Sequence, residues 1–165
     1  MSPAFTAAVR QERMFRIRFF TPTFVNDDGV WQVGGELMLG TARLCFLTDL
    51  SHWGVGHYER QWRDGISRLV HGPSSALMTS YRGPGVAMAH HTMWALWRED
   101  GHVWVQEHTV VAAELDAPFN PNEPYEHVGV RVPAAENGLP IPEWRVGLEH
   151  VHAAVLGIRL PKLPG

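Results

Sequence analysis

The sequence contains one cysteine, Cys45, in 165 residues. A single thiol excludes an intramolecular disulfide framework and a zinc site built from several cysteines. Long hydrophobic runs are also missing, since the uninterrupted apolar stretches are only a few residues long and a membrane-spanning helix needs about 20. Residues 1–18 mix arginines with polar residues and lack the apolar core of a signal peptide. These absences predict a cytoplasmic protein without a membrane segment.

Charged residues are scarce as well, at 19% of the chain, where about 25% is usual. Hydrophobic residues make up 45%, with seven tryptophans and seven phenylalanines. This composition excludes an intrinsically disordered chain, which needs high charge and few aromatic residues. A chain of this length buries about 70% of its unfolded surface. We therefore expect a single domain with one apolar core.

One segment in the first two thirds of the chain has a clear helical period. Between residues 55 and 70, apolar side chains recur every three or four positions, which is the spacing of one helical face; they are Val55, Tyr58, Trp62, Ile66 and Leu69. The sequence His71-Gly72-Pro73 predicts the end of this helix. A second, shorter helix is expected at about residues 146–156, although Gly147 and Gly157 weaken it.

Alternating or short apolar runs between turn signals predict several strands, at residues 14–20, 30–39, 40–47 and 75–81. Gly34 and Gly35 fall inside one of them and predict a bulge or a sharp bend. A helix combined with these strands predicts an α+β domain, in which an antiparallel sheet carries the main helix on one face.

Asp100-Gly101 separates two long β-rich runs, residues 86–98 and 102–115. Asp-Gly between apolar runs is a strong signal for a two-residue hairpin turn. The register of such a hairpin follows from the turn, and it predicts four facing pairs: Trp97 with Trp104, Trp94 with Glu107, Met93 with His108 and His91 with Val110.

Ten histidines are many for this length, and three of them, His90, His91 and His108, fall on the predicted hairpin. His91 and His108 would be diagonal neighbours on one face, while Glu107 would point to the other. A catalytic zinc needs three protein ligands, and local spacing supplies no third one. Histidines that are satisfied or exposed explain the pattern with no cofactor. The alternative is a small metal-dependent enzyme or ligand-binding protein that uses these three side chains.

Motifs for covalent or phosphate chemistry are absent from the sequence. It contains neither the Gly-x-Ser-x-Gly of serine hydrolases nor a glycine-rich phosphate loop. Cys45 lies in the apolar run Leu44-Cys45-Phe46-Leu47, so we expect a buried, unreactive thiol. Nothing in the sequence therefore predicts a catalytic residue or an enzyme.

Several short motifs, taken in order, resemble a known family. The first are Leu50-Ser51-His52-Trp53 and Tyr58-Glu59-Arg60-Gln61-Trp62, and the later ones are Asp116-Ala117-Pro118-Phe119, Asn122-Glu123-Pro124-Tyr125 and Glu143-Trp144-Arg145. Over most of residues 33–152 the chain resembles the immunity proteins of contact-dependent growth inhibition systems in Gram-negative bacteria. Residues 1–13 match nothing in this pattern and are expected to be disordered, which leaves 14–165 as the domain.

The resemblance implies a protein that binds and neutralises the C-terminal toxin domain of a partner adhesin, often a nuclease, without catalysis. The residues shared with the family would then be scaffold, because the fold is common to proteins that block different toxins. The expected scaffold residues are Trp53, Tyr58, Gln61, Trp62 and Trp144. The resemblance implies no membrane or nucleic-acid partner, and it leaves the oligomeric state open.

The net charge of −3 conceals a strong asymmetry along the chain. Residues 1–98 carry ten arginines against seven acidic residues, whereas residues 99–150 carry ten acidic residues against two arginines. An acidic half disfavours nucleic-acid binding. It is either a solvated surface or a surface that attracts a basic toxin. On the second interpretation the candidate contacts are Glu107, Glu114, Asp116, Glu123, Glu126 and Glu136.

Overall fold

The computed structural model describes residues 11–86 and 88–158, which form two β-sheets with helices packed on them. The five-stranded sheet has the order β1 (Gln11–Glu12), β9 (Trp144–Gly147), β8 (His102–Val111), β7 (His90–Glu99) and β6 (Ser74–Ser80). In the four-stranded sheet, β4 (Trp31–Leu39) pairs with β2 (Phe15–Phe19), β3 (Phe24–Val25) and β5 (Ala42–Asp49). All of these pairings are antiparallel except that of β1 with β9.

The helices confirm the α+β class and the predicted main helix. The α-helices are α1 (Val55–Arg68) and α2 (Leu148–Ala153), and the 3-10 helices are η1 (Ala112–Glu114), η2 (Pro124–His127) and η3 (Ala154–Gly157). The prediction of a helix from residue 146 was wrong at its start. Val146 is instead fully buried in β9, opposite Val103 of β8. Gln11 and Glu12, from the segment expected to be disordered, form β1, and residues 1–10 lie outside the described part.

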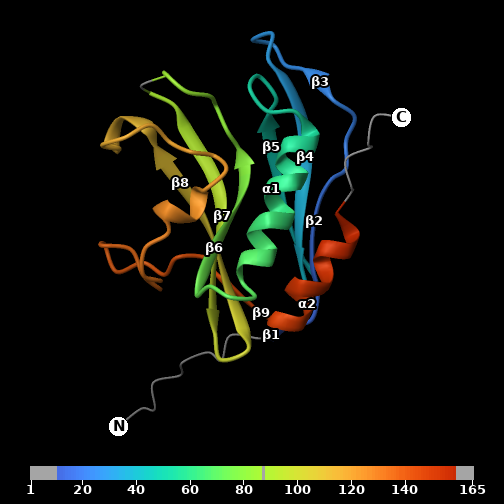
Figure 1. Ribbon diagram of the computed structural model, residues 1–165, viewed down its shortest axis with the longest axis vertical. Helices are drawn as coiled ribbons and strands as arrows, with labels where there is room; N and C mark the ends of the chain where they lie inside the picture. The colour runs from blue at the N-terminus through green and yellow to red at the C-terminus, as the bar shows by residue number, and fades with distance from the viewer. Residues whose placement is uncertain (1–10, 87, 159–165) are drawn as a thin grey trace.

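Figure 1 shows the five-stranded sheet on the left and the four-stranded sheet on the right, with α1 in front of the region where they approach. The inner faces of both sheets and the apolar face of α1 enclose one core. Trp62 of α1 lies at its centre, with its ring 4.7 Å from that of Phe19 and 6.3 Å from that of Phe46. The helices α2 and η3 pack against β2 and α1 at the right-hand side of the view.

Side chains of α1 bind the free edge of β6. The Gln61 amide donates to the Ala76 carbonyl at 2.8 Å and accepts from the Met78 N–H at 2.7 Å. The Trp62 indole N–H donates to the Met78 carbonyl at 2.6 Å. An edge strand exposes a row of unpaired backbone groups that invites aggregation. Here the helix takes the place of a neighbouring strand and satisfies these groups inside the core.

The Tyr58 side chain also binds backbone groups, at the place where β5 and β6 approach each other. Its hydroxyl donates to the Asp49 carbonyl at 2.7 Å and accepts from the Tyr81 N–H at 2.9 Å. Burial raises the pKa of Tyr58 above its usual range, so the phenol remains a donor. The motif Tyr58-x-x-Gln61-Trp62 therefore joins the two sheets through one helix face, since all three side chains are buried.

The predicted hairpin turn and register are confirmed, whereas the strands are shorter than the predicted runs 86–98 and 102–115, since β7 begins at His90 and β8 ends at Val111. Strands β7 and β8 pair in the predicted register, including Trp97 with Trp104 and Trp94 with Glu107. Asp100 and Gly101 both have positive φ, at 49° and 78°, as the two-residue turn with a matching twist requires. Strand β7 is an interior strand of the sheet, between β8 and β6.

The prediction of a bulge at Gly34 and Gly35 was wrong, because β4 and β5 pair without interruption. The glycines instead make room for neighbours: a side chain at Gly35 would overlap the Phe46 ring, and one at Gly34 would meet Thr21. Cys45 was also predicted wrongly, since its thiol is exposed. Strand alternation turns Leu44 and Phe46 inward and Cys45 outward, which a continuous apolar run does not reveal.

Glu36 is a buried carboxylate on the outer face of the four-stranded sheet. It is 2% exposed and accepts hydrogen bonds from Arg43 of β5 and, at 2.6 Å, from Arg18 of β2. The two guanidinium groups, Arg43 first, lower the pKa of Glu36. Three strands are thus joined by one charged cluster.

Glu36→Gln is expected to lower the free energy of unfolding at pH 7 by about 1–2 kcal/mol, since both arginines are partly exposed and solvent screens them. The folded-state pKa lies below that of the unfolded chain, so the carboxylate stabilises the fold above the unfolded pKa of about 4.3. That stabilisation is lost as the pH falls through the folded pKa. Urea unfolding between pH 7 and pH 3 should show the free energies of unfolding of the wild type and Glu36→Gln converging as the pH falls. A difference between them that stays constant with pH would contradict this account. So would a difference no larger than the one that the exposed Asp28→Asn control produces.

Candidate functional site

Residues 112–143, here called the acidic segment, cover the outer face of the five-stranded sheet. The segment carries six acidic residues and one arginine. In Figure 1 it forms the gold to orange chain on the left of the sheet. Its backbone is bound to the sheet by two buried side chains: Trp97 donates to the Gly129 carbonyl at 2.9 Å and Gln106 donates to the Val132 carbonyl at 3.1 Å. A segment with little regular structure is thereby held in one position.

A charged clamp closes the end of the acidic segment. Arg131 binds Glu143 through two parallel hydrogen bonds of 2.9 and 2.8 Å, and Gln106 donates to the same carboxylate at 3.0 Å. The Arg131 guanidinium also lies 3.7 Å from the centre of the Trp104 ring. Bidentate arginine–carboxylate pairs are strong and directional. Glu143 is therefore committed to the fold and is not available to a partner.

Aromatic contacts hold the beginning of the acidic segment. Phe119 stacks on His91, with ring centres 4.5 Å apart, and lies 5.1 Å from His127. Arg68 of α1 lies 3.4 Å from the centre of the Tyr125 ring. Burial lowers the pKa of His91, and the nearby Arg82 acts in the same direction. The motifs that contain Phe119 and Tyr125 thus dock this segment on the sheet and on the helix.

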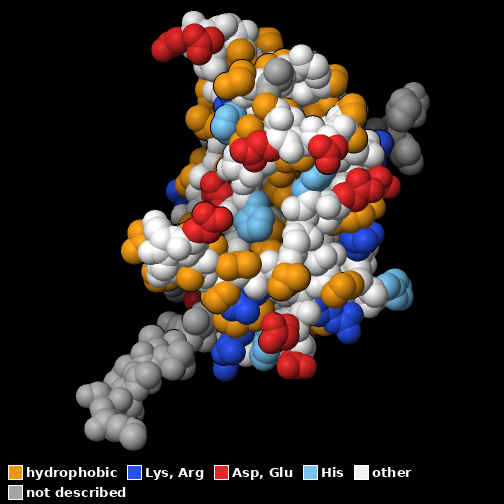
Figure 2. Space-filling view, turned by 90° about the vertical axis from the view of Figure 1, so that its left-hand side faces the viewer, with side chains coloured by type: hydrophobic (Ala, Val, Ile, Leu, Met, Phe, Trp, Pro, Cys, Tyr) orange, Lys and Arg blue, Asp and Glu red, His pale blue; other side chains and the backbone are white. Residues whose placement is uncertain are grey.

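The predicted contact residues divide into groups. Glu114, Asp116, Glu126 and Glu136 are exposed on the acidic segment, whereas Glu123 is half-buried and accepts from Asn120 at 3.3 Å. Glu107 is exposed but lies on the opposite face of β8 from Gln106, which binds the segment. In Figure 2 acidic side chains are spread over this side of the molecule from its top to its lower end, with polar and apolar surface between them.

A pocket that the sequence did not predict opens beside Asp116. It has a volume of about 350 Å³, and its walls include Val86, His91, Leu115, Asp116, Pro118 and Phe119. Apolar walls beside exposed carboxylates give the arrangement of a protein interface, with an apolar centre and a polar rim. One wall is the continuous stretch from Leu115 to Phe119, and the other comes from residues 83–86 and from His91, which the fold brings against it.

The three hairpin histidines do not form a ligand set. His91 accepts from the Arg82 N–H at 3.2 Å, and His108 bonds to Gln106 at 3.0 Å and contacts the Trp97 ring. His90 lies on the opposite face of β7. Within the described residues, no group of three or more histidine, cysteine or acidic side chains could hold a metal ion. The metal-dependent alternative therefore gains no support from the fold.

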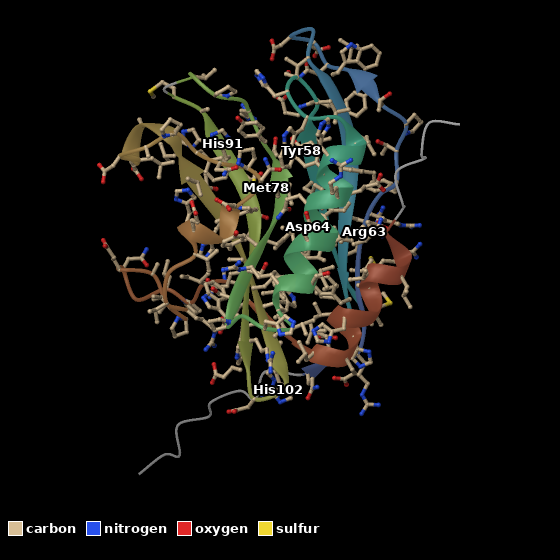
Figure 3. All side chains as sticks on the ribbon, viewed as in Figure 1. Tyr58, Arg63, Asp64, Met78, His91 and His102 are labelled. Atoms are coloured by element: carbon tan, nitrogen blue, oxygen red, sulfur yellow. The ribbon has the colours of Figure 1, made fainter. Side chains whose placement is uncertain are left out.

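Among the residues expected to be scaffold, Trp144 is partly buried and the other four are buried, namely Trp53, Tyr58, Gln61 and Trp62. Figure 3 shows Tyr58 and Met78 close together where α1 faces β6, and Arg63 on the opposite side of the helix. Trp53 packs edge-on against Tyr58, with ring centres 5.2 Å apart. Trp144 at the start of β9 packs edge-on against Trp94 at 6.4 Å. No helix in the described part of the chain is long and apolar enough to cross a membrane.

Comparison with known proteins gives a family and a similar fold. No curated protein matches the chain. A chain of the "CdiA-CT/CdiI toxin and immunity complex from Enterobacter cloacae" has a similar structure, with a TM-score of 0.79 and 22% sequence identity over 88% of this chain and 98% of that one. At this identity the similarity establishes the fold. The family model of the CdiI N-terminal domain matches residues 48–154. Because that match covers more than half of the sequence, the chain belongs to the CdiI family, the immunity proteins of contact-dependent growth inhibition that its motifs resemble.

Proposed function

We propose that this protein is a cytoplasmic immunity protein that binds the C-terminal toxin domain of its cognate adhesin and neutralises it without catalysis. The observation that carries the proposal, beside family membership, is the acidic segment. Four of its carboxylates, on Glu114, Asp116, Glu126 and Glu136, are exposed and form no ion pair with another described residue. They are free to meet a basic partner.

The proposed toxin is a nuclease. An enzyme that cleaves nucleic acid needs a basic groove, because contacts with the charged phosphate backbone supply most of its affinity for the substrate. An acidic surface complements such a groove, accelerates association and competes with the substrate. The structural relative comes from a complex of a toxin with its immunity protein, which supports the same kind of partner here.

Neutralisation requires only that the toxin's groove be covered. The clamp of Arg131 on Glu143 and the stacking of Phe119 on His91 fix the acidic segment before binding. A surface that is already ordered loses little conformational entropy when it binds, and this favours a tight complex. The pocket beside Asp116 offers an apolar centre for the same contact.

Co-expression with the toxin domain encoded by the neighbouring gene tests the function. Cells should survive induction of the toxin only when this protein is present, and the two proteins should elute together from gel filtration at physiological salt. An empty vector controls for the toxicity. Continued killing together with separate elution would refute an immunity function for this toxin.

The double variant Glu114→Lys/Asp116→Lys is expected to slow association with the toxin about tenfold at low salt, because surface charges act mainly on the association rate. The effect should shrink as salt screens the charges. The matched control is Asp27→Lys/Asp28→Lys, which makes the same charge change at the exposed turn before β4. Stopped-flow measurements of the association rate at two ionic strengths distinguish the two double variants. Equal slowing by both variants would mean that net charge acts and that the acidic segment is not the contact surface.

A further inference from the structure

The pocket beside Asp116 has an aromatic inner wall that is fixed by its own contacts. Its two buried members are His91 of β7 (Figure 3) and Phe119 of the acidic segment, which are 1% and 9% exposed. Their rings stack with centres 4.5 Å apart, and His91 accepts from the Arg82 N–H at 3.2 Å. Burial lowers the pKa of His91, so its ring is uncharged at neutral pH. An uncharged, ordered surface is therefore in place before any partner binds.

The mouth of the pocket is lined by apolar groups that face solvent. Residues 83–86 form one side, and Val86 at the end of this loop is 51% exposed. Met88, two residues later, is 75% exposed. Leu115 and Pro118 of the acidic segment form the other side. The pocket has a volume of about 350 Å³, which is at the lower end of the range for ligand pockets, about 300–1,000 Å³, and suits one large side chain.

The charge beside the pocket indicates which partner fills it. Among the described residues that line it, Asp116 alone is charged at neutral pH, and its carboxylate forms no ion pair with another described residue. Glu114 is exposed two residues before it. A symmetric pair of copies of this chain would bring the same carboxylates face to face, which disfavours a second copy. A basic toxin domain is instead attracted to this rim.

We propose that this pocket receives one apolar side chain of the toxin domain and is the anchor of the complex. The inference rests on the proposed function and specifies the chemistry of the contact. An apolar patch with a polar rim is typical of an interaction site, and a side chain that is buried at its centre supplies much of the binding energy. The carboxylates of the rim act earlier, on encounter. The pocket therefore governs dissociation, whereas the carboxylates govern association.

A charge placed in the pocket wall tests the anchor. Val86→Asp should accelerate dissociation of the complex with the neighbouring toxin domain about 10- to 100-fold, because an apolar side chain would then be buried against a carboxylate. Association should not slow, since the added charge complements a basic toxin. The matched control is Val70→Asp, at a residue that is 47% exposed after the end of α1 and does not line the pocket. It should leave dissociation unchanged. Both variants should unfold close to the wild-type urea concentration, because both side chains are exposed.

A thiol moved into the pocket wall gives an independent measurement. Cys45 is the only cysteine of the chain, and Ala117 is exposed and lines the pocket. In the purified complex, alkylation of Cys45→Ser/Ala117→Cys by N-ethylmaleimide should slow at least tenfold relative to the free variant. The control is Cys45→Ser/Val70→Cys, whose thiol should react equally in the free and bound protein.

The outcomes separate this inference from the proposed function. Protection of the thiol in the Ala117→Cys variant, together with fast dissociation of Val86→Asp alone, would establish the anchor. A stable complex in which that thiol reacts at the free rate, or from which Val86→Asp dissociates as slowly as the wild type, would overturn the anchor and leave immunity intact. Protection that grows with the concentration of the free protein would assign the pocket to a second copy and also overturn it. Absence of any complex in gel filtration would refute the proposed function, and the anchor with it.

Discussion

Trp62→Ala is expected to remove about 4–7 kcal/mol from the free energy of unfolding, from the lost side chain and from the Met78 carbonyl left without its donor. The Trp62 side chain is completely buried, contacts Phe19 and Phe46 of the four-stranded sheet, and binds β6 of the five-stranded sheet. Natural domains have only about 5–15 kcal/mol of stability in total. Urea unfolding followed by circular dichroism should show a protein that is largely unfolded or close to it.

Two further variants make the Trp62 result interpretable. Trp62→Phe keeps an aromatic ring but loses the N–H, and we expect a loss of about 1–3 kcal/mol. Trp31→Ala removes a tryptophan that is 55% exposed, so it should cost less than about 1 kcal/mol. If Trp62→Ala were no more destabilising than Trp31→Ala, the helix would not be the element that joins the two sheets.

Glu143→Ala is expected to release the acidic segment from the sheet. The substitution leaves the Arg131 guanidinium and the Gln106 amide without their common acceptor. Breaking such a pair costs about 2–4 kcal/mol when it is mostly buried, and the Glu143 and Arg131 side chains are 12% and 22% exposed. Amide hydrogen exchange should accelerate in residues 112–143 while the core helix α1 stays protected. Toxin binding should weaken too, because the segment must then be ordered on binding.

Glu136→Ala is the control for this experiment. Its carboxylate is exposed on the same segment and forms no hydrogen bond or ion pair with another described residue. The free energy of unfolding should therefore change by less than about 0.5 kcal/mol. The amide exchange rates of the segment should match those of the wild type. Equal exchange in the two variants would show that the acidic segment does not depend on the clamp of Arg131 and Glu143.

Local spacing was sufficient for the elements that depend on local interactions. The period of three and four placed α1 within two residues of its end, and Asp100-Gly101 predicted the β7–β8 register residue by residue. A helical face and a two-residue turn are encoded by neighbours a few positions apart. The same order of short motifs led to the family, which the match over residues 48–154 confirms.

Contacts between distant segments explain the predictions that were wrong. Residues 146 and 147 were expected to begin the last helix, yet they belong to β9 because β8 and β1 offer this segment partners. Cys45 and the glycines of β4 were predicted wrongly for a related reason. An apolar run does not tell which side chains face the core, and a glycine does not show which neighbour needs its space.

The candidate site shows the same division between sequence and structure. The acidic balance of residues 99–150 was evident from composition alone, and so was the absence of nucleophile and metal motifs. Only the tertiary structure could separate Glu143, which is bound to Arg131, from the exposed carboxylates beside it, and place Glu107 on the opposite face of β8 from the segment. Charge is a property of single residues, whereas its availability depends on what long-range folding brings within hydrogen-bond distance.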